Sequence, residues 1–469
     1  MAKIKKVHLL RAGFEAGKAM KEALKAMQHR NWAKKSRDVK MEVLEDLLDH
    51  PDKYEEDEIL GPIVLALTEE ERSTIMKRIP PMRNEGVSCS IYGREHIDEG
   101  AVDQINVAAK LPVARATALM PDAHVGYGLP IGGVLATENA IIPYAVGVDI
   151  GCRMALSIFP LGERHLKRNE YQYTQDLKSQ TCFGAGKGVD DPFDDPILER
   201  SEFRDIPFLR NLKDKAAKQI GSSGGGNHFV EFGLVEIQDN ENEWNIEPGT
   251  YLGLLSHSGS RGLGATIATE YTRIAQKLTP LPKEAKNLAW LDLDTEEGQE
   301  YWIAMNLAGD YASACHDHIH RRLAKTIGEK PICRIENHHN FAWKQKLEDG
   351  TEVIVHRKGA TPAAKGELGI IPGSMTAPGF IVRGKGNPTS LHSASHGAGR
   401  VLSRRKARTS ITRHQLNKHL KEKGVSLIGG GIDEAPFVYK DIHQVMKHQT
   451  DLVDVIGAFY PKIVRMDKQ

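Results

Sequence analysis

Short apolar runs alternate with glycine-rich turns from about residue 80 to the C-terminus, and this alternation limits the possible fold more than any other feature. Runs bounded in this way predict strands that end in loops carrying the polar residues. Longer windows with helical spacing of apolar residues lie between them, so the whole pattern predicts an α+β fold. The predicted strands lie within residues 131–160, 227–237, 250–264 and 379–386, and the predicted helices cover Leu263–Gln276, Gln299–Ile327 and Arg413–Lys423.

The first 75 residues differ from the rest and predict a short N-terminal helical extension. Residues 1–40 contain twelve Lys or Arg against three acids, whereas residues 41–60 contain nine acids against one Lys. This pattern predicts a basic amphipathic helix followed by an acidic hinge, or more simply a pair of solvated helices. We therefore divide the chain into an extension, residues 1–75, and one large domain, residues 76–469. Apolar residues at helical spacing in the extension are Phe14, Met20, Leu24, Met27, Val43, Leu44, Leu47 and Leu48.

Net charge and cysteine usage exclude several classes of protein. The formal charge of +1 excludes a bulk polycation, so any nucleic-acid binding depends on a local basic surface. The five cysteines are widely spaced and form no CxxC pair, which argues against a disulfide framework and against a zinc ribbon. No apolar stretch is long enough for a signal peptide or a membrane span. We therefore expect a cytoplasmic protein with no membrane association.

Five glycine-rich turns hold the residues most able to bind a metal. Each turn lies at the end of a predicted strand, where side chains from different strands converge. A carboxylate, a thiolate and three imidazoles are too many ligands for one structural zinc, and they suit two metal ions that share a ligand. Spacing alone leaves zinc, manganese and iron open, and any one of these histidines alone would be a structural hydrogen-bond partner. The turns contain Asp122 and His124; Asp149 and Cys152; Asn227, His228 and Glu231; His257; and His338 and His339.

The segment SLHSASHGAGRVLSR sets His396 between small residues and follows it with arginines. Because Gly397–Gly399 present almost no side chain, their backbone N–H groups can reach a phosphate, while Arg400 and Arg404 can bind a second one. The plainer alternative is a loop histidine satisfied by hydrogen bonds. The stretch from Arg400 to Gly424 contains nine Lys or Arg and one Glu, which fits either a phosphodiester track or a solvated helix face.

Three other segments carry polar residues that we do not assign to the site. The tract CHDHIH, Cys315–His320, lies inside a predicted helix whose three histidines do not share one face, so we expect no metal there. FGAGKG, Phe183–Gly188, lacks the spacing of a phosphate-binding loop. The segment Asp190–Asp205 is rich in Asp and Pro and predicts an exposed loop.

Nine motifs in this order resemble the RtcB family of RNA-splicing ligases: MPDAHVGYG, GVDIGC, GNHFVE, HSGSRG, HHN, HRKGAT, PGSM, SHGAGR and DEAPFVYKDI. The resemblance extends from about Met82 to the C-terminus and implies a large mixed-sheet catalytic domain with a central metal and GTP cleft. Members join an RNA 3′-phosphate or 2′,3′-cyclic phosphate end to a 5′-hydroxyl end, in tRNA splicing or RNA repair, with GTP and two manganese ions. The resemblance therefore implies RNA as substrate and a helper protein, archease, as a candidate partner.

The same resemblance implies roles for individual residues. His396 would be the nucleophile that takes up GMP as a phosphoramidate, with the acid Asp122 beside it. The implied metal ligands, with Cys152 bridging the ions, are Asp149, Cys152, His228, His257 and His339. The implied nucleotide-binding residues are Asn227, His228, Phe229, Val230, Glu231, His339, Asn340, Pro372, Gly373, Ser374, Met375, Gly379, His396, Gly397, Ala398, Gly399, Tyr439 and Lys468. The residues implied to meet RNA are Asn227, Arg400 and Arg404.

Two positions after PGSM depart from the family pattern, where Thr376 and Gly379 replace a glycine and a serine. That serine touches the guanylate in the family, so the changes bear on guanine affinity. Two other functions stay open from the residues alone. A metal-dependent phosphohydrolase would need the metal residues but not His396, and a slow relative would bind RNA ends for repair or regulation.

Overall fold

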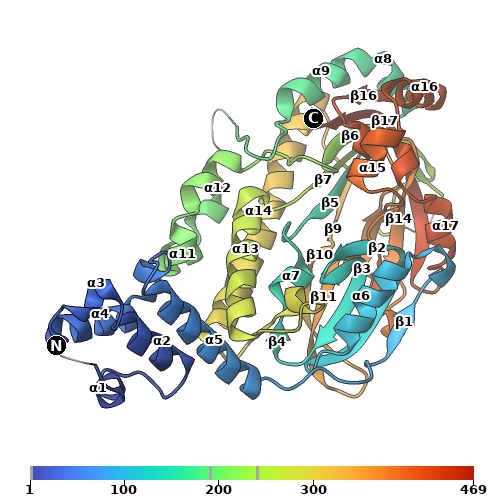
Figure 1. The fold of residues 1–469 in the computed structure, drawn as a ribbon. Helices are drawn as coiled ribbons and strands as arrows, with labels where there is room; N and C mark the ends of the chain where they lie inside the picture. Colours follow the sequence, from blue (N-terminus) through green and yellow to red (C-terminus); the bar gives the residue numbers. More distant parts are fainter. Residues whose placement is uncertain (1–3, 190–192, 239–241, 469) are drawn as a thin grey trace. The chain divides into compact units, whose positions relative to one another are not determined.

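The computed structural model describes residues 4–189, 193–238 and 242–468, and the chain divides into two compact units. The first comprises Met1–Pro80 with Lys277–Pro280, and the second comprises Pro81–Gln276 with Leu281–Gln469. Each unit has its own apolar core, so each is described by itself (Figure 1).

The first unit is helical. Its helices pack around buried apolar side chains such as Leu9, Phe14 and Leu44, which explains the helical spacing of apolar residues in this part of the sequence. Ser36 caps one of them, because its side-chain oxygen accepts a hydrogen bond from the backbone N–H of Val39. The helices are α1 (Lys6–Arg11), α2 (Lys18–Ala26), α3 (Arg30–Ala33), α4 (Arg37–Asp49) and α5 (Gly61–Arg78).

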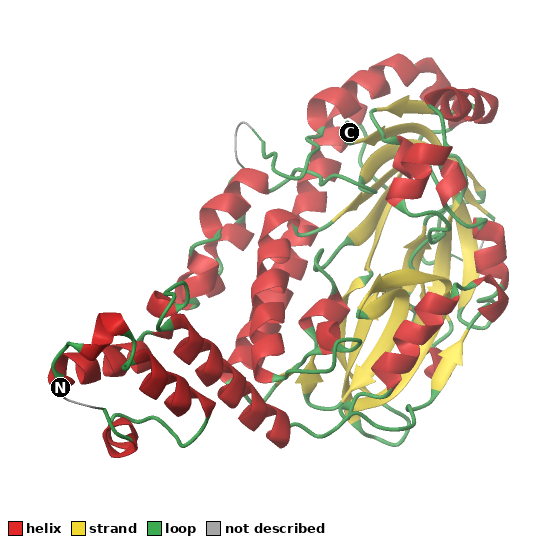
Figure 2. Ribbon diagram, viewed as in Figure 1, coloured by secondary structure: helices red, strands yellow, loops and turns green. Residues whose placement is uncertain are grey.

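An eight-stranded sheet is the largest element of the second unit (Figure 2). Seven strands follow the order β13-β14-β17-β6-β7-β5-β9, and β16 pairs with β17 in parallel. Both faces are buried, because alternate residues of β5 and β7 contribute to two different apolar clusters. The strands are β5 (Arg153–Phe159), β6 (Phe229–Ile237), β7 (Gly249–Ser258), β9 (Cys333–His338), β13 (Leu368–Ile371), β14 (Gly379–Gly384), β16 (Ser426–Ile428) and β17 (Val453–Met466).

A second sheet has five strands in the order β1-β2-β3-β11-β10, and two short ladders pair β12 with β15 and β4 with β8. The pairing of β2 with β3 is irregular between Leu119 and His124, which bends the strand at the turn that contains Asp122. The remaining strands are β1 (Cys89–Ile91), β2 (Ala114–Tyr127), β3 (Leu129–Thr137), β4 (Ala140–Ile141), β8 (Leu291–Asp292), β10 (Asn340–Lys346), β11 (Glu352–Lys358), β12 (Ala360–Pro362) and β15 (Ser393–Ser395).

Helices cover the sheets of the second unit. The helices predicted at Leu263–Gln276, Gln299–Ile327 and Arg413–Lys423 are all present, and α14 packs on β5 and β7. Together with the two sheets they confirm the α+β fold. The helices are α6 (Glu99–Ala109), α7 (Pro143–Val146), α8 (Glu163–Arg168), α9 (Glu170–Gln180), α10 (Glu202–Asp205), α11 (Pro207–Arg210), α12 (Lys213–Gln219), α13 (Arg261–Leu278), α14 (Glu296–Ile327), α15 (Arg404–Ser410), α16 (Arg413–Lys423) and α17 (Ile442–Lys447).

The prediction of an exposed loop at Asp190–Asp205 was wrong for the part that the structure describes. Residues 190–192 lie outside the described residues, but a 3-10 helix spans Pro196–Glu199 and α10 follows it. Asp195 caps the 3-10 helix, and Phe203 is buried in the core beneath α13 and α14. Prolines and acids therefore begin helical turns here. Across the described ranges, no helix has both the length and the apolar character needed to cross a membrane.

Candidate metal and nucleotide site

Neighbouring strand ends bring the predicted metal ligands to one edge of the eight-stranded sheet. Cys152 directly precedes β5, His228 directly precedes β6, and His257 is the second-last residue of β7. His339 lies between β9 and β10, and its backbone N–H donates to the carbonyl oxygen of Cys152 at 2.9 Å. Because adjacent strands here are antiparallel, the starts of β5 and β6 and the ends of β7 and β9 meet at the same edge.

The side chains of these residues form a continuous cluster. Cys152 Sγ lies 3.2 Å from His257 Nε2 and 3.5 Å from His228 Nε2. His257 Nε2 is 3.2 Å from His339 Nε2, and Asp149 Oδ2 is 2.8 Å from His228 Nε2. One thiol, three imidazoles and one carboxylate are ligands suited to divalent transition metals, and the ligand atoms of Cys152, His228 and His257 lie within 4.8 Å of one another.

Burial keeps the imidazoles of His257 and His339 and the thiol of Cys152 uncharged. It lowers the pKa of His257 to about 3, and the charge of His228 adds to the effect. Burial likewise holds the pKa of His339 well below its usual value. The pKa of the Cys152 thiol is raised well above its usual value by burial and by the charge of Asp149. Neutral imidazoles are ready to act as ligands, and a bound cation would favour the thiolate.

A glycine allows the loop before β5 to approach α14. Gly151 has a left-handed φ of +69°, and a Cβ on it would lie 2.8 Å from the Cα of Gly309 in α14. A larger residue at either position would push the loop outward. The GVDIGC turn therefore needs its second glycine to set the position of Cys152.

His396 is held by Asp122. The ring Nδ1 of His396 lies 2.6 Å from Asp122 Oδ2, and this oxygen also accepts the backbone N–H groups of His396 and Gly397 at 3.1 and 3.3 Å. Burial alone would raise the pKa of Asp122, but the charge and hydrogen bond of His396 lower it below its usual value. The carboxylate therefore orients the imidazole through Nδ1 and leaves Nε2 free to react.

The approach of the two segments depends on Gly399. Its φ is +71°, and a Cβ there would lie 1.9 Å from the carbonyl oxygen of Asp122. The ring of His396 in turn lies 5.1 Å from that of His339, between centroids. His396 and the predicted metal ligands are thus parts of one site.

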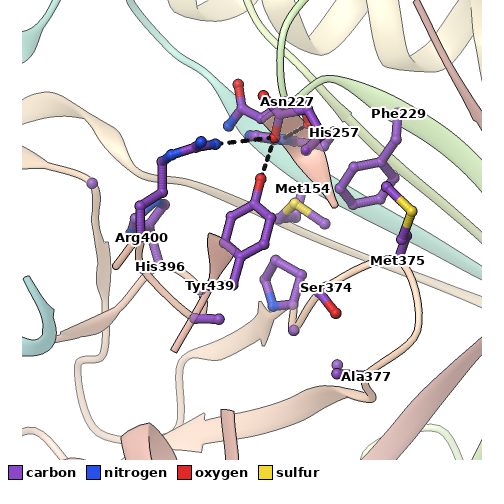
Figure 3. A pocket seen from close by; sticks show the side chains of 18 of the residues that line it. Met154, Asn227, Phe229, His257, Ser374, Met375, Ala377, His396, Arg400 and Tyr439 are labelled. Atoms are coloured by element: carbon purple, nitrogen blue, oxygen red, sulfur yellow. Dashed lines mark hydrogen bonds and ion pairs between the residues drawn. The ribbon is translucent and has the colours of Figure 1, made fainter. Parts of the chain in front are cut away.

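A cavity of about 290 Å³ lies beside His396 (Figure 3). Figure 3 shows Arg400 and Tyr439 on one side of it and Phe229 with Met375 on the other. Most of the predicted site residues line the cavity: Asp149, Cys152, Asn227, Phe229, Glu231, His257, His339, Asn340, Pro372, Gly373, Ser374, Met375, Gly379, His396, Gly397, Ala398, Gly399, Arg400, Arg404 and Tyr439.

Three predicted nucleotide-binding residues do not line the cavity, and one of them, His228, belongs to the cluster around Cys152. Val230 is buried in the apolar cluster on the opposite face of the sheet, because side chains of β6 alternate and Phe229 and Glu231 face the cavity. Lys468 is exposed, two residues beyond the end of β17, and does not line the cavity in the described part of the chain. The cavity wall therefore has three fewer of these side chains than the sequence predicted.

Two carboxylates that the sequence analysis did not select hold the arginines. Arg404 pairs with Asp433 at 2.9 Å and with Glu434, and Arg400 lies 3.4 Å from Glu434. The hydroxyl of Tyr439 also donates to Glu434. Both acids are buried and belong to the motif DEAPFVYKDI. Tyr439 is the residue of this motif that the sequence predicted to bind the nucleotide.

Several other histidines form hydrogen bonds or ring contacts that stabilise the fold. His338 is stacked on Trp343 with ring centroids 5.0 Å apart. In α14, His316 and His320 both contact the hydroxyl of Ser256, at 2.6 and 2.7 Å, and His318 contacts Asp195. Hydrogen bonds within the core thus account for the CHDHIH tract.

The family model and the relatives that match this chain all carry the same family name. A sequence model of the family described as tRNA-splicing ligase RtcB matches residues 104–207 and 199–467. The RNA-splicing ligase RtcB of Escherichia coli (strain K12) is 34% identical over 394 residues, covering 77% of this chain and 92% of that protein. The tRNA-splicing ligase RtcB of Thermococcus kodakarensis is 29% identical over 474 residues, covering 82% of this chain and 98% of that protein.

Proposed function

The chain belongs to the RtcB family of tRNA-splicing ligases, and we propose that it joins RNA ends carrying a 3′-phosphate or 2′,3′-cyclic phosphate to 5′-hydroxyl ends. GTP is the proposed energy source and manganese the proposed metal. A cyclic phosphate is first opened to a 3′-phosphate by hydrolysis. The substrate is proposed from the resemblance to the family, and tRNA halves and damaged RNA both carry such ends.

In the proposed first step, Nε2 of His396 attacks the α-phosphorus of GTP. A phosphorus–nitrogen bond forms, and the bond to pyrophosphate breaks with pyrophosphate as the leaving group. Asp122 supports this step because it accepts a hydrogen bond from the Nδ1–H and stabilises the positive charge that develops on the ring. GMP then passes to the RNA 3′-phosphate, and the 5′-hydroxyl displaces GMP to form the new phosphodiester.

The proposed metal ligands are Asp149, Cys152, His228, His257 and His339. Cys152 would be shared by the two ions. The donor set fits this role, since Nε2 of His257 and Nε2 of His339 face each other at 3.2 Å and both rings are neutral. When bound, the ions would act as Lewis acids that neutralise charge on the phosphates. Such soft ligands also accept zinc, so manganese is proposed from the family.

The cavity beside His396 is the proposed guanylate pocket. Glu231 lies on its wall, and burial holds the pKa of this carboxyl well above its usual value. A buried carboxyl can bond the N–H edge of a guanine base, while the rings and chains of Phe229 and Met375 can contact its faces. Gly397–Gly399 would present backbone N–H groups to the phosphates.

RNA is proposed to approach along Asn227, Arg400 and Arg404, beside the basic segment that continues into α15 and α16. Archease is a proposed helper and the cytoplasm the proposed location. We also propose that residues 76–469 form the catalytic domain. Every residue of the proposed reaction then lies in this domain.

One observation carries the proposal: His396 is oriented by Asp122 at 2.6 Å, and its ring lies beside a cluster of metal ligands. The test is incubation of the purified chain with α-labelled GTP and manganese. We expect an acid-labile, base-stable protein–GMP adduct that is absent in His396→Ala. Phosphate release without any adduct would instead support a metal-dependent phosphohydrolase, and RNA binding without either activity would support an RNA-end-binding relative.

A further inference from the structure

A second group of metal-ligating side chains lies on the second unit, away from the cavity. Glu95 and His96 belong to a 3-10 helix, Arg94–His96, and His448 directly follows α17. Their ligand atoms lie within 4.8 Å of one another, although the residues are some 350 positions apart along the chain. None of the three lines the cavity beside His396.

The distances suit a tetrahedral ion. Glu95 Oε1 lies 3.4 Å from His448 Nε2 and 4.0 Å from His96 Nε2, and the two imidazole centroids are 5.0 Å apart. Zinc bonds of about 2.0–2.1 Å to nitrogen place tetrahedral ligand atoms about 3.3 Å apart. Small rotations of the exposed Glu95 and His96 side chains would close the remaining gap.

Nε2 of His448 forms no hydrogen bond with the described residues and could therefore bind a metal ion. It is buried, and in the described part of the chain no hydrogen-bond donor or acceptor satisfies it; the Glu95 carboxylate is its ionic neighbour. A buried polar atom normally has a partner, so an unsatisfied nitrogen facing a carboxylate and a second imidazole points to a cation between them.

The backbone is shaped around the His448 ring. Gly93 has a φ of +67°, and a Cβ on it would lie 3.0 Å from Cγ of His448. The carbonyl oxygen of Gly93 also accepts the backbone N–H of His96 at 3.0 Å. One glycine therefore makes room for the first imidazole and anchors the turn that carries the second.

The charges around the cluster leave the carboxylate available. Arg94 is bound to Glu99 at 2.6 Å, so it does not occupy Glu95. The pKa of Glu95 is lowered below its usual value by a backbone hydrogen bond and by the charges of His448, His96 and Lys447. Lys447 is a cation that opposes metal binding, and it is exposed at the end of α17.

We propose that Glu95, His96 and His448 bind one zinc ion, with water as the fourth ligand. Two imidazoles and one carboxylate form a borderline ligand set that favours zinc over magnesium or calcium. No thiolate takes part, which distinguishes this site from the cluster around Cys152. The ion joins the Arg94–His96 turn to the C-terminal end of α17 and thereby stabilises the folded chain.

The test is zinc content at equilibrium, measured on the full-length chain dialysed against zinc-buffered solution. The wild type should hold one zinc per chain more than His96→Ala and one more than Glu95→Gln. His443→Ala is the matched control, since His443 is exposed on α17 but outside the cluster, and it should hold as much zinc as the wild type. Equal zinc content in the wild type and in His96→Ala would overturn the proposal.

Cobalt distinguishes this site from the catalytic one. In a Cys152→Ala background, cobalt bound at Glu95, His96 and His448 should give visible d–d absorption without a sulfur charge-transfer band. Adding His96→Ala should lower that absorption by the share of one cobalt ion per chain, and absorption of unchanged intensity would assign the metal elsewhere. Because His96 is exposed, its replacement should leave the circular dichroism spectrum unchanged, which separates loss of metal from loss of folding.

Discussion

At the scale of single residues, the site depends on which nitrogen of each imidazole is occupied. His396 gives Nδ1 to Asp122 and keeps Nε2 for chemistry, whereas His257 and His339 turn Nε2 toward each other. In the proposed mechanism the same side chain therefore serves as nucleophile or ligand according to the partner of its other nitrogen. Replacement of that partner is therefore the sharpest probe of each role.

Asp122→Asn should slow self-guanylylation by about 10²–10⁴-fold, because the amide cannot stabilise the imidazolium that forms as His396 attacks. Single-turnover formation of the labelled adduct measures the rate. Metal content should stay at the wild-type value, because Asp122 contacts His396 and not the ligand cluster. A wild-type rate in Asp122→Asn would remove the carboxylate from the mechanism.

Cys152→Ala should lose more metal than His339→Ala, because a bridging thiolate contacts both ions and each imidazole contacts one. Metal analysis of both purified variants after identical dialysis decides the comparison. Circular dichroism provides the folding control. Equal losses with intact folding would argue that Cys152 does not bridge.

Gly379→Ser should lower the KM for GTP by about two- to tenfold, since one neutral hydrogen bond contributes about 0.5–1.5 kcal/mol. Gly379 lines the cavity, and a Cβ there would lie 3.3 Å from the Cα of Pro372, a tight contact that a small shift relieves. Gly379→Ala is the matched control with the same Cβ and no hydroxyl. Equal KM values for the two variants would show that the hydroxyl does not reach the nucleotide.

At the scale of elements, strand ends and one helix position the site. The irregular β2 turns Asp122 toward the segment after β15, and the proposed metal ligands lie at one edge of the sheet formed by β5, β6, β7 and β9. The N-terminal residue of α15, Arg404, is held by the buried acids Asp433 and Glu434. These acids set the direction of the arginine before any RNA binds.

Arg404→Ala should therefore have two effects. RNA joining should fall more than self-guanylylation, and the melting temperature should also fall, because Asp433 and Glu434 lose a partner while buried. Arg405→Ala, at the exposed next position of α15, is the control. It should flatten the salt dependence of RNA binding by about one counterion at most and leave the melting temperature unchanged. An unaltered melting temperature in Arg404→Ala would show that the acids do not depend on this arginine.

At the scale of the whole molecule, the chain has two compact units with separate cores. Every residue proposed to take part in the reaction belongs to the second unit, whereas the basic and acidic surfaces of residues 1–60 belong to the first. The proposed chemistry of the site therefore needs no residue of the first unit.

A chain that begins at Pro81 should fold and form the GMP adduct at the rate of the full-length protein, since it keeps the cavity and the metal ligands. Thermal unfolding and single-turnover guanylylation measure the two properties. A truncated chain that is folded but cannot form the adduct would show that the extension takes part in catalysis.

Much of the fold could be predicted from local pattern. Glycine-bounded apolar runs predicted β6, β7 and β14, and helical spacing predicted α13, α14 and α16, because both signals depend on neighbours along the chain. The segment Asp190–Asp205 was the exception, since Asp and Pro begin helices as readily as they form loops. The family motifs supplied the residues around the cavity, including His396, but local pattern could not place them in space.

Only the tertiary structure decided which side chains meet. The pairing of Asp122 with His396, the hold of Asp433 and Glu434 on Arg404, and the convergence of Glu95, His96 and His448 all join distant segments. The exposure of Lys468 likewise follows from where β17 ends, whereas the orientation of Val230 follows from the alternation of side chains along β6. Sequence determines local conformation through short-range sterics and apolar period, whereas these contacts depend on strand order and packing, which arise only when the whole chain buries its apolar surface.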